Sequence, residues 1–109
     1  MNEPEVLMIL SAMSQQTRLR IIRYLVRCGA EGACAGDIGA HVAAASSRAS
    51  FHLAALERAG IITSQRRSRS IIYRAELARL GGVISYLLHD CCAGHPDVWS
   101  CCAPDAACC

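Results

Sequence analysis

Apolar residues recur every three or four positions in four parts of the chain, which is the spacing of an amphipathic helix. The four sets are Val6, Leu7, Leu10 and Met13; Leu19, Ile22, Leu25 and Val26; Ala49, Leu53 and Leu56; and Leu77, Leu80, Ile84, Leu87 and Leu88. They predict helices over 4–12, from a cap at Ser14 to Gly29, over 43–60 and over 75–90. A shorter helix over 35–42 is predicted between the second and third of these.

The segments "IITSQRR" and "RSIIYRA" predict two short strands joined by a tight, arginine-rich turn. "EGACAG" predicts a turn, and the glycine and prolines after Asp90 predict an irregular tail. Helices, a two-helix unit, a hairpin and a last helix follow one another as in a winged helix-turn-helix. We therefore expect a mainly α fold with a small β-hairpin. Its winged helix-turn-helix and dimerisation domain would cover 1–90, followed by a cysteine-rich tail over 91–109.

Positive charge is concentrated in the middle of the chain. Between Ser46 and Arg74 six arginines stand against one acid, Glu57, so the local charge is six minus one, or +5. Such a patch suits the phosphates of nucleic acid. Small or cationic side chains at the head of helix 43–60 and in the hairpin turn can hydrogen-bond base edges or phosphates. The predicted DNA-binding residues are Ser46, Ser47, Arg48, Ser50, His52, Arg66, Arg67 and Arg69.

His52 has a second interpretation, because its side chain can also pack against the core or a partner subunit. At the sequence level we expect it to avoid the apolar face of its helix, as the serines and Arg48 do.

Several classes of protein do not fit this sequence. Its start, "MNEPEVLMILSAMSQQTRLR", has acids where a secretory signal needs basic residues, and no apolar run approaches the roughly 18 residues of a membrane span. A cytoplasmic protein that does not enter the membrane is therefore expected. No nucleophile has a credible base, and there is no phosphate loop, so we expect neither an enzyme nor a catalytic cofactor.

Six of the eight cysteines follow Asp90 as three adjacent pairs. The pairs are Cys91 and Cys92, Cys101 and Cys102, and Cys108 and Cys109. In a reducing compartment such clusters bind metals or take part in redox chemistry more often than they form structural disulfides. Adjacent cysteines do not easily bond to each other, because the ring is strained, but they can present two sulfurs to one large, soft atom. Cys28 and Cys34 are expected to pack as small residues instead.

The chain resembles the ArsR (ArsR/SmtB) family of metalloregulatory repressors over about 13–90. The resemblance is carried by "SQQTRLRIIRYL", by "DIGAHVAAASSRASFHLAALERAGIITSQRRSRSIIYR" and by the helix that follows, and "SFHLAALERAGII" is its most specific part. It implies a homodimer that binds operator DNA when unloaded and releases it when an inducer binds.

The tail is similar to that of family members that sense trivalent arsenic through C-terminal cysteines. The run "HDCCAGHPD" implies Cys91 and Cys92 as the first two thiolate ligands. Val98 stands where the third cysteine usually falls, so Cys101 or Cys102 is the expected third ligand, and a two-thiol site for an organoarsenical is an alternative. Inducer binding would order the tail and change the spacing of two recognition helices.

Two further functions stay open on the sequence. One is a repressor that senses another soft or borderline ion, such as zinc, cadmium or antimonite. The other metal sites of the family are poorly matched, since only Cys34 remains near the third helix and only His89 and Asp90 end the long one. The second function is a thiol redox switch, in which mild oxidation would form a bond such as Cys92–Cys101 and change DNA affinity. The roles of Cys108 and Cys109 are undecided.

Overall fold

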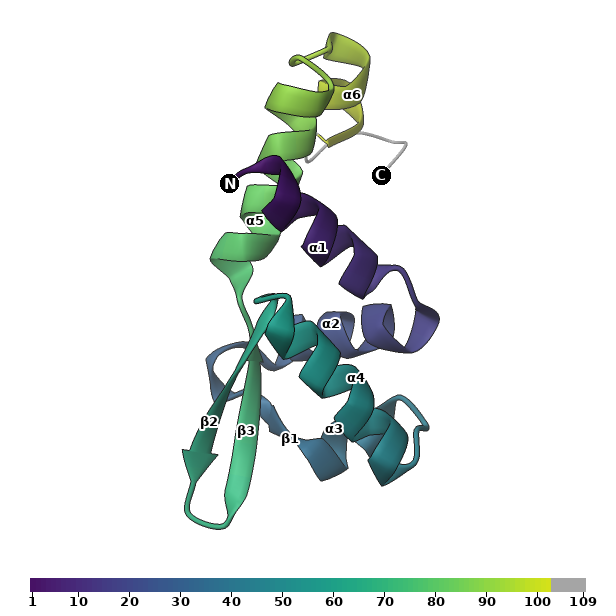
Figure 1. Cartoon of the computed structure of the whole chain (residues 1–109), viewed down its shortest axis with the longest axis vertical. Helices are drawn as coiled ribbons and strands as arrows, with labels where there is room; N and C mark the ends of the chain where they lie inside the picture. Colours follow the sequence, from purple (N-terminus) through teal and green to yellow (C-terminus); the bar gives the residue numbers. More distant parts are fainter. Residues whose placement is uncertain (103–109) are drawn as a thin grey trace.

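The computed structural model describes residues 1–102, and of Cys102 only the backbone. The helices are α1 (Glu3–Met13), α2 (Gln16–Cys28), α3 (Ala35–His41), α4 (Ser46–Arg58), α5 (Leu77–Tyr86) and α6 (Pro96–Cys102), with a 3-10 turn η1 (Gly29–Glu31) and a π-helical turn η2 (Leu87–Cys91). The strands are β1 (Ala33–Cys34), β2 (Ile62–Arg67) and β3 (Ser70–Ala75). Figure 1 shows α4 in front of α2 and α3, the hairpin beneath, and α5 leading away to α6. The predicted mainly α fold with a small hairpin is confirmed.

The junction between α1 and α2 differs from the prediction in its cap. Ser14 ends α1, where its hydroxyl donates to the carbonyl oxygen of Ser11 at 2.9 Å. The cap of α2 is Gln15, whose side-chain oxygen accepts a hydrogen bond from the Arg18 amide at 2.8 Å. The prediction of Ser14 as the cap was wrong because the extended backbone that precedes the helix falls one residue later.

The sheet has three antiparallel strands in the order β1-β3-β2, so one strand was missed at the sequence level. The segment predicted as a turn contains β1, which pairs Ala33 with Tyr73. Gly32 precedes β1 with φ +66°, and a Cβ there would collide with the carbonyl oxygen of Tyr73. Only glycine fits this close approach, which ties the start of α3 to the hairpin.

A single core joins the helices to the hairpin. Its most deeply buried side chains are Ile9, Ile21, Leu25, Ile38, Leu53, Leu56, Ile61 and Ile62. They come from α1, α2, α3, α4 and the segment that leads into β2, so the core fixes α4 relative to the hairpin. None of the helices in residues 1–102 has the length and apolar character needed to cross a bilayer.

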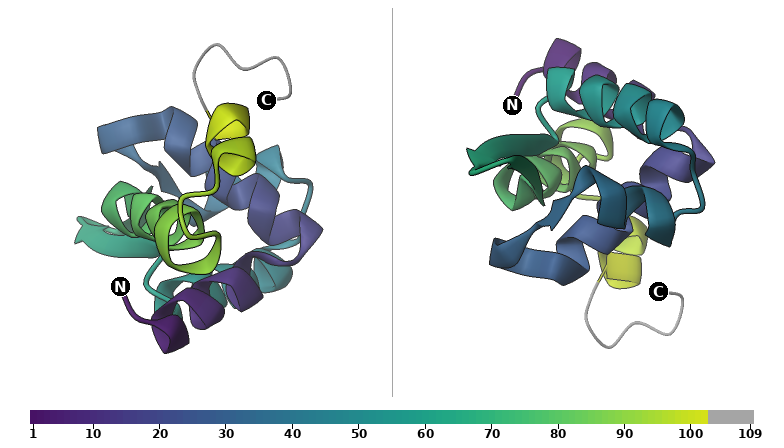
Figure 2. Two further views of the ribbon diagram at one scale, coloured as in Figure 1. Left: turned by 90° about the horizontal axis from the view of Figure 1, so that it is seen from above. Right: turned by 90° about the horizontal axis from the view of Figure 1, so that it is seen from below.

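The chain after Asp90 is more regular than predicted. Pro96 opens α6, and the amide of Asp97 donates to Nδ1 of His95 at 3.1 Å, which caps that helix. The prediction of an irregular tail was wrong up to Cys102 because proline is well tolerated at the first position of a helix. Figure 2 shows α6 next to the end of the helix formed by α5 and η2.

Candidate nucleic-acid interface and thiol site

Most of the residues predicted to bind DNA from α4 are exposed. Ser46, Ser47, Arg48 and Ser50 are open to solvent, while Ala49, Leu53 and Leu56 point into the core. The helix begins at Ser46 after Ala45, whose side chain makes no capping hydrogen bond. The backbone amides at this end are therefore not satisfied by a side-chain cap, and such amides suit a phosphate oxygen.

His52 differs from the other predicted residues because it is only 6% exposed. It follows Ala49 by three residues and precedes Leu56 by four, so it belongs to the buried face, and the expectation that it avoids that face was wrong. Its Nδ1 accepts a hydrogen bond from Nε of Arg18 at 3.0 Å. Burial, and then the charges of Arg18 and Arg48, lower the pKa of His52. The burial favours the packing interpretation over direct contact with DNA.

Phe51 was not singled out at the sequence level. It is 62% exposed in the middle of the face that carries Ser47 and Ser50. The guanidinium of Arg18 lies 5.7 Å from the centre of its ring, so Arg18 contacts both Phe51 and His52. An exposed aromatic ring can contact the methyl group of thymine in the major groove. The signal was available, since Phe51 is the only phenylalanine of the chain and interrupts a row of small polar residues.

The hairpin carries the second group of predicted residues. Arg66 and Arg67 end β2 and Arg69 lies in the turn, and all three are exposed. Within residues 1–102 none of them makes a hydrogen bond or ion pair, so their guanidinium groups are available for phosphates. The turn is made with Ser68 at φ 56°, a left-handed conformation that usually requires glycine.

Other contacts on the hairpin hold it in place. The hydroxyl of Ser64 donates to a carboxylate oxygen of Glu57 at 2.6 Å, which links β2 to α4. Arg74 donates to the carbonyl oxygen of Ala30 at 2.6 Å and to the side-chain oxygen of Gln65 at 2.8 Å. Arg74 is thus engaged within the fold, so its charge contributes less to an open basic patch than those of the turn arginines.

The Cys91–Cys92 pair lies where the last long helix ends. Cys91 is the last residue of the π-helical turn η2 and is exposed. Cys92 is half-buried, and its amide donates to the carbonyl oxygen of Leu87 at 2.9 Å. The chain then reverses through Ala93 and Gly94, both with positive φ. π-Helical turns occur frequently at functional sites, because they displace side chains from the regular helical positions.

Helix α6 folds back toward this end of the molecule. The rings of Trp99 and His89 meet edge to face, with centroids 5.3 Å apart. Cys101, one turn further along α6, is exposed. Among the described side chains no three His, Cys, Asp or Glu residues lie close enough to hold a metal ion together. The side chain of Cys102, and Cys108 and Cys109, lie outside the described part of the chain.

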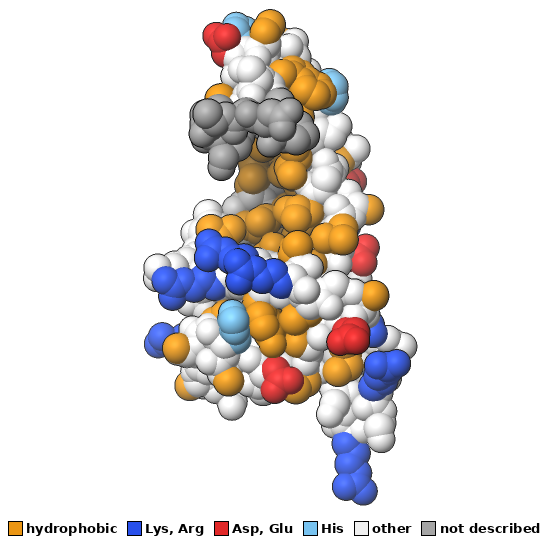
Figure 3. Space-filling model, turned by 180° about the vertical axis from the view of Figure 1, so that it is seen from behind, with side chains coloured by type: hydrophobic (Ala, Val, Ile, Leu, Met, Phe, Trp, Pro, Cys, Tyr) orange, Lys and Arg blue, Asp and Glu red, His pale blue; other side chains and the backbone are white. Residues whose placement is uncertain are grey.

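Helices α1 and α5 leave apolar side chains open to solvent. Exposed examples are Leu7, Met8 and Leu10 on α1 and Leu77 and Ile84 on α5. Figure 3 shows orange apolar surface between the arginine-bearing half of the molecule and its far tip. Exposed apolar surface on this scale is typical of a contact with another protein.

Comparison with known proteins agrees with this geometry. Residues 15–64 match the family described as "Bacterial regulatory protein, arsR family". An ArsR-like transcriptional regulator from Rhodococcus sp. RHA1 has a similar structure, with a TM-score of 0.72 and 26% identity over 83% of this chain and 82% of that chain. A structure described as "Possible transcriptional regulator for arsenical resistance" has a TM-score of 0.61 and 27% identity, over 72% of this chain and 82% of that chain.

A third structure has the same fold at lower identity. It is a homodimeric winged helix-turn-helix DNA-binding domain from Mycobacterium bovis, a possible ArsR-family regulator, with a TM-score of 0.63 and 22% identity over 85% of this chain and 86% of that chain. None of the curated proteins matches the sequence.

The arrangement of α3, α4 and the hairpin, together with these likenesses, defines a DNA-binding winged helix-turn-helix. The chain is a transcriptional regulator with the helix-turn-helix of the ArsR family, and its family and fold are those of regulators rather than enzymes. The family resemblance and the fold class expected from the sequence are confirmed at this level.

Proposed function

We propose that the protein is an arsenic-responsive repressor that acts in the cytoplasm. In this proposal it binds operator DNA as a homodimer and leaves the DNA when trivalent arsenic binds thiolates at its C-terminal end. The observation that carries the proposal is the position of Cys91 and Cys92, which lie side by side in the chain at the end of the helix formed by α5 and η2.

The DNA-binding half of the proposal assigns base and phosphate contacts to α4 and the hairpin. Ser46, Ser47, Arg48 and Ser50 would position or read the DNA, since they are exposed at the start of α4. The hairpin arginines Arg66, Arg67 and Arg69 would hold the backbone. His52 would act indirectly, because its contact with Arg18 supports the exposed ring of Phe51 next to it.

The homodimer is supported by the exposed apolar side chains of α1 and α5. A second copy of the chain would cover them, and the Mycobacterium bovis domain of the same fold is homodimeric. Two recognition helices are then needed, spaced to match half-sites about one DNA turn apart. A change at the end of α5 would alter this spacing if α5 lies at the contact between subunits.

The inducer follows from the chemistry of the thiols. Trivalent arsenic is soft and prefers sulfur, and each arsenic–sulfur bond replaces one hydroxyl of arsenous acid and releases one water. Cys91 and Cys92 would provide two bonds. Cys101 or Cys102 on α6 would provide the third, which requires α6 to shift, because no third ligand is gathered at the pair in the described residues. The structure described as a regulator for arsenical resistance supports this choice of inducer.

The same observation favours one alternative, an organoarsenical held by two thiolates alone. Sensing of another soft metal such as zinc, cadmium or antimonite, and a redox switch that bonds Cys92 to Cys101, are less well supported by the structure, since a metal would need more ligands than the pair provides. All of these functions use the same cysteines, so the inducer separates them.

The test is release of operator DNA by reduced protein on addition of arsenite, followed by fluorescence anisotropy. Cys91→Ser is expected to bind DNA normally but to stay bound at arsenite concentrations that release the unaltered protein. Cys34→Ser, which removes a thiol near α3, is the matched control and is expected to respond normally. Normal release from Cys91→Ser would reject the proposed site.

A further inference from the structure

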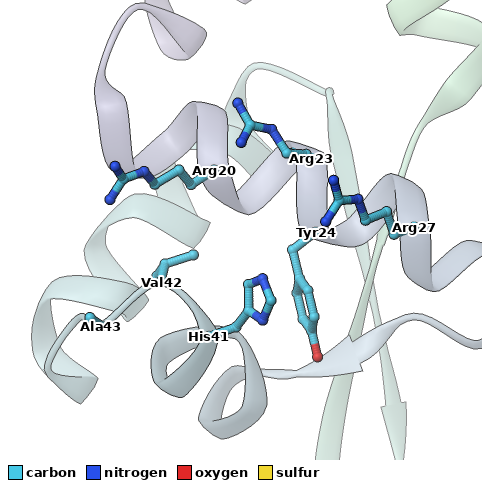
Figure 4. A pocket seen from close by; sticks show the side chains of 7 residues that line it. All are labelled: Arg20, Arg23, Tyr24, Arg27, His41, Val42 and Ala43. Carbon is cyan, nitrogen blue, oxygen red and sulfur yellow. The ribbon is translucent and has the colours of Figure 1, made fainter.

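A second candidate binding site lies between α2 and the end of α3, apart from the thiols and from α4. A cavity of about 260 Å³ opens there, lined by three arginines of α2 and by Tyr24, His41 and the turn after α3. Figure 4 shows Arg20, Arg23 and Arg27 along α2, above the rings of Tyr24 and His41. This volume is smaller than that of most pockets for drug-sized ligands, roughly 300–1,000 Å³, and suits a small ligand.

The three arginines point away from the DNA-reading helix. Arg18 of α2 faces α4, where it bonds His52. Arg20, Arg23 and Arg27 follow two, five and nine positions later, which places them on the opposite side of a helix that turns about 100° per residue. Figure 3 shows this side as a band of arginine side chains above a histidine.

The charge of the cavity is not balanced by the fold. Within residues 1–102, Arg20, Arg23 and Arg27 make no hydrogen bond or ion pair, and no acidic residue lines the cavity. Spacings of three and four residues place these like charges next to each other on the helix, an arrangement that destabilises it. An anion bound between them would remove this repulsion.

An aromatic pair forms one wall of the cavity. The rings of Tyr24 and His41 are stacked with centroids 4.1 Å apart and planes inclined by 21°. Burial, and then hydrogen bonding to Cys28, raise the pKa of the Tyr24 hydroxyl, and Asp37 adds to this effect. Asp37 therefore acts on the hydroxyl end of Tyr24, whereas the arginines lie at the other end of the ring, as Figure 4 shows. The stack fixes His41 beneath the arginines, where its imidazole can donate to an anion.

The geometry points to this cavity as a binding site for the phosphate group of a small molecule, either the free ion or a small phosphate ester. Guanidinium groups match phosphate oxygens in geometry as well as charge. A carboxylate would leave part of this donor set unused, because it offers fewer oxygens than a phosphate. DNA is disfavoured as the ligand because the arginines lie on the far side of α2 from α4. The inference does not depend on the arsenic proposal.

The experiment uses the full-length, reduced protein with inorganic phosphate and phenyl phosphate as probes. Ring resonances of Tyr24 and His41 are followed by NMR while chloride keeps the ionic strength constant. The test variant is Arg23→Gln with Arg27→Gln, and the matched control is Arg66→Gln with Arg67→Gln in the hairpin. Duplex DNA binding is measured for both variants.

A saturable shift that weakens at least about tenfold in the α2 variant and persists in the hairpin variant is expected. Equal affinity for the two probes would assign the site to the free ion, and tighter binding of phenyl phosphate would assign it to an ester. The absence of a saturable shift, or equal weakening in both variants, would overturn the inference. So would an α2 variant that loses as much DNA affinity as the hairpin variant, because the arginines would then contact DNA.

Discussion

The indole of Trp99 on α6 lies against the imidazole of His89 in η2, with ring centroids 5.3 Å apart. This contact joins the segment that carries Cys101 to the turn that carries Cys91. In the proposed mechanism α6 shifts when a third thiolate reaches the inducer, so the environment of Trp99 changes with binding.

The emission of Trp99, the only tryptophan, is therefore expected to report inducer binding. Arsenite should shift its emission in the unaltered protein, and His89→Ala should show the shifted emission before arsenite is added, because its stacking partner is gone. Fluorescence titration of both proteins measures this. Identical spectra for the two unliganded proteins would contradict the contact.

The lowered pKa of His52 predicts a specific loss of stability in acid. Burial and two arginines hold this pKa below the ordinary value of 6.5, so the unfolded chain binds a proton more readily than the folded one. The stability from neutral His52 is complete above pH 6.5 and is lost as the pH falls from there through the folded pKa. Urea unfolding at pH 7.5 and 5.5 should show a smaller pH effect for His52→Asn than for the unaltered protein; an equal effect would exclude His52 as its source.

Gly32 is predicted to be the least replaceable glycine of the sheet. Gly32→Ala should destabilise the protein by more than about 2 kcal/mol, because its Cβ would meet the Tyr73 carbonyl oxygen at a left-handed φ. Gly36→Ala is the control, since a Cβ there has nothing within 4 Å and lies inside α3. The midpoints of thermal unfolding of the two variants compare them directly. Equal midpoints would contradict the close approach of Gly32 to β3.

The hairpin arginines should govern the salt dependence of DNA binding. Arg67→Gln is expected to weaken binding to all sequences alike and to lower the slope of log K against log salt by about 1. Arg27→Gln on the far side of α2 is the control and should leave the slope unchanged. Anisotropy titrations at several salt concentrations provide the slopes. A changed slope for Arg27→Gln alone would place the DNA on the wrong face.

Phe51 should contribute to recognition through its exposed ring. Phe51→Ala is expected to cost about 1 kcal/mol, roughly fivefold in affinity, and most of this at sites with a thymine under the helix. Competition between operator variants measures the effect. A uniform loss at every site would indicate that Phe51 only holds Arg18 in place.

The sequence predicts the helical part of this fold well because its apolar periodicity is strong. The π-helical turn, β1 and α6 were not foreseen, since two-residue strands leave no pattern and Pro96 was taken as a breaker rather than as a helix start. The burial of His52 could have been predicted, because it shares the spacing of Ala49 and Leu56. The pairing of Tyr24 with His41 could not, since contacts between α2 and α3 depend on how the helices pack.

The central claim is that Cys91 and Cys92 bind trivalent arsenic and thereby control DNA binding. The most direct measurement is a titration of the reduced, DNA-bound protein with arsenite, with phenylarsenite and zinc in parallel, that counts protected thiols at each degree of DNA release. Three protected thiols at full release by arsenite is the expected result, and two with tighter phenylarsenite binding would favour the organoarsenical. If neither arsenical protects thiols while zinc does, the arsenic assignment is wrong.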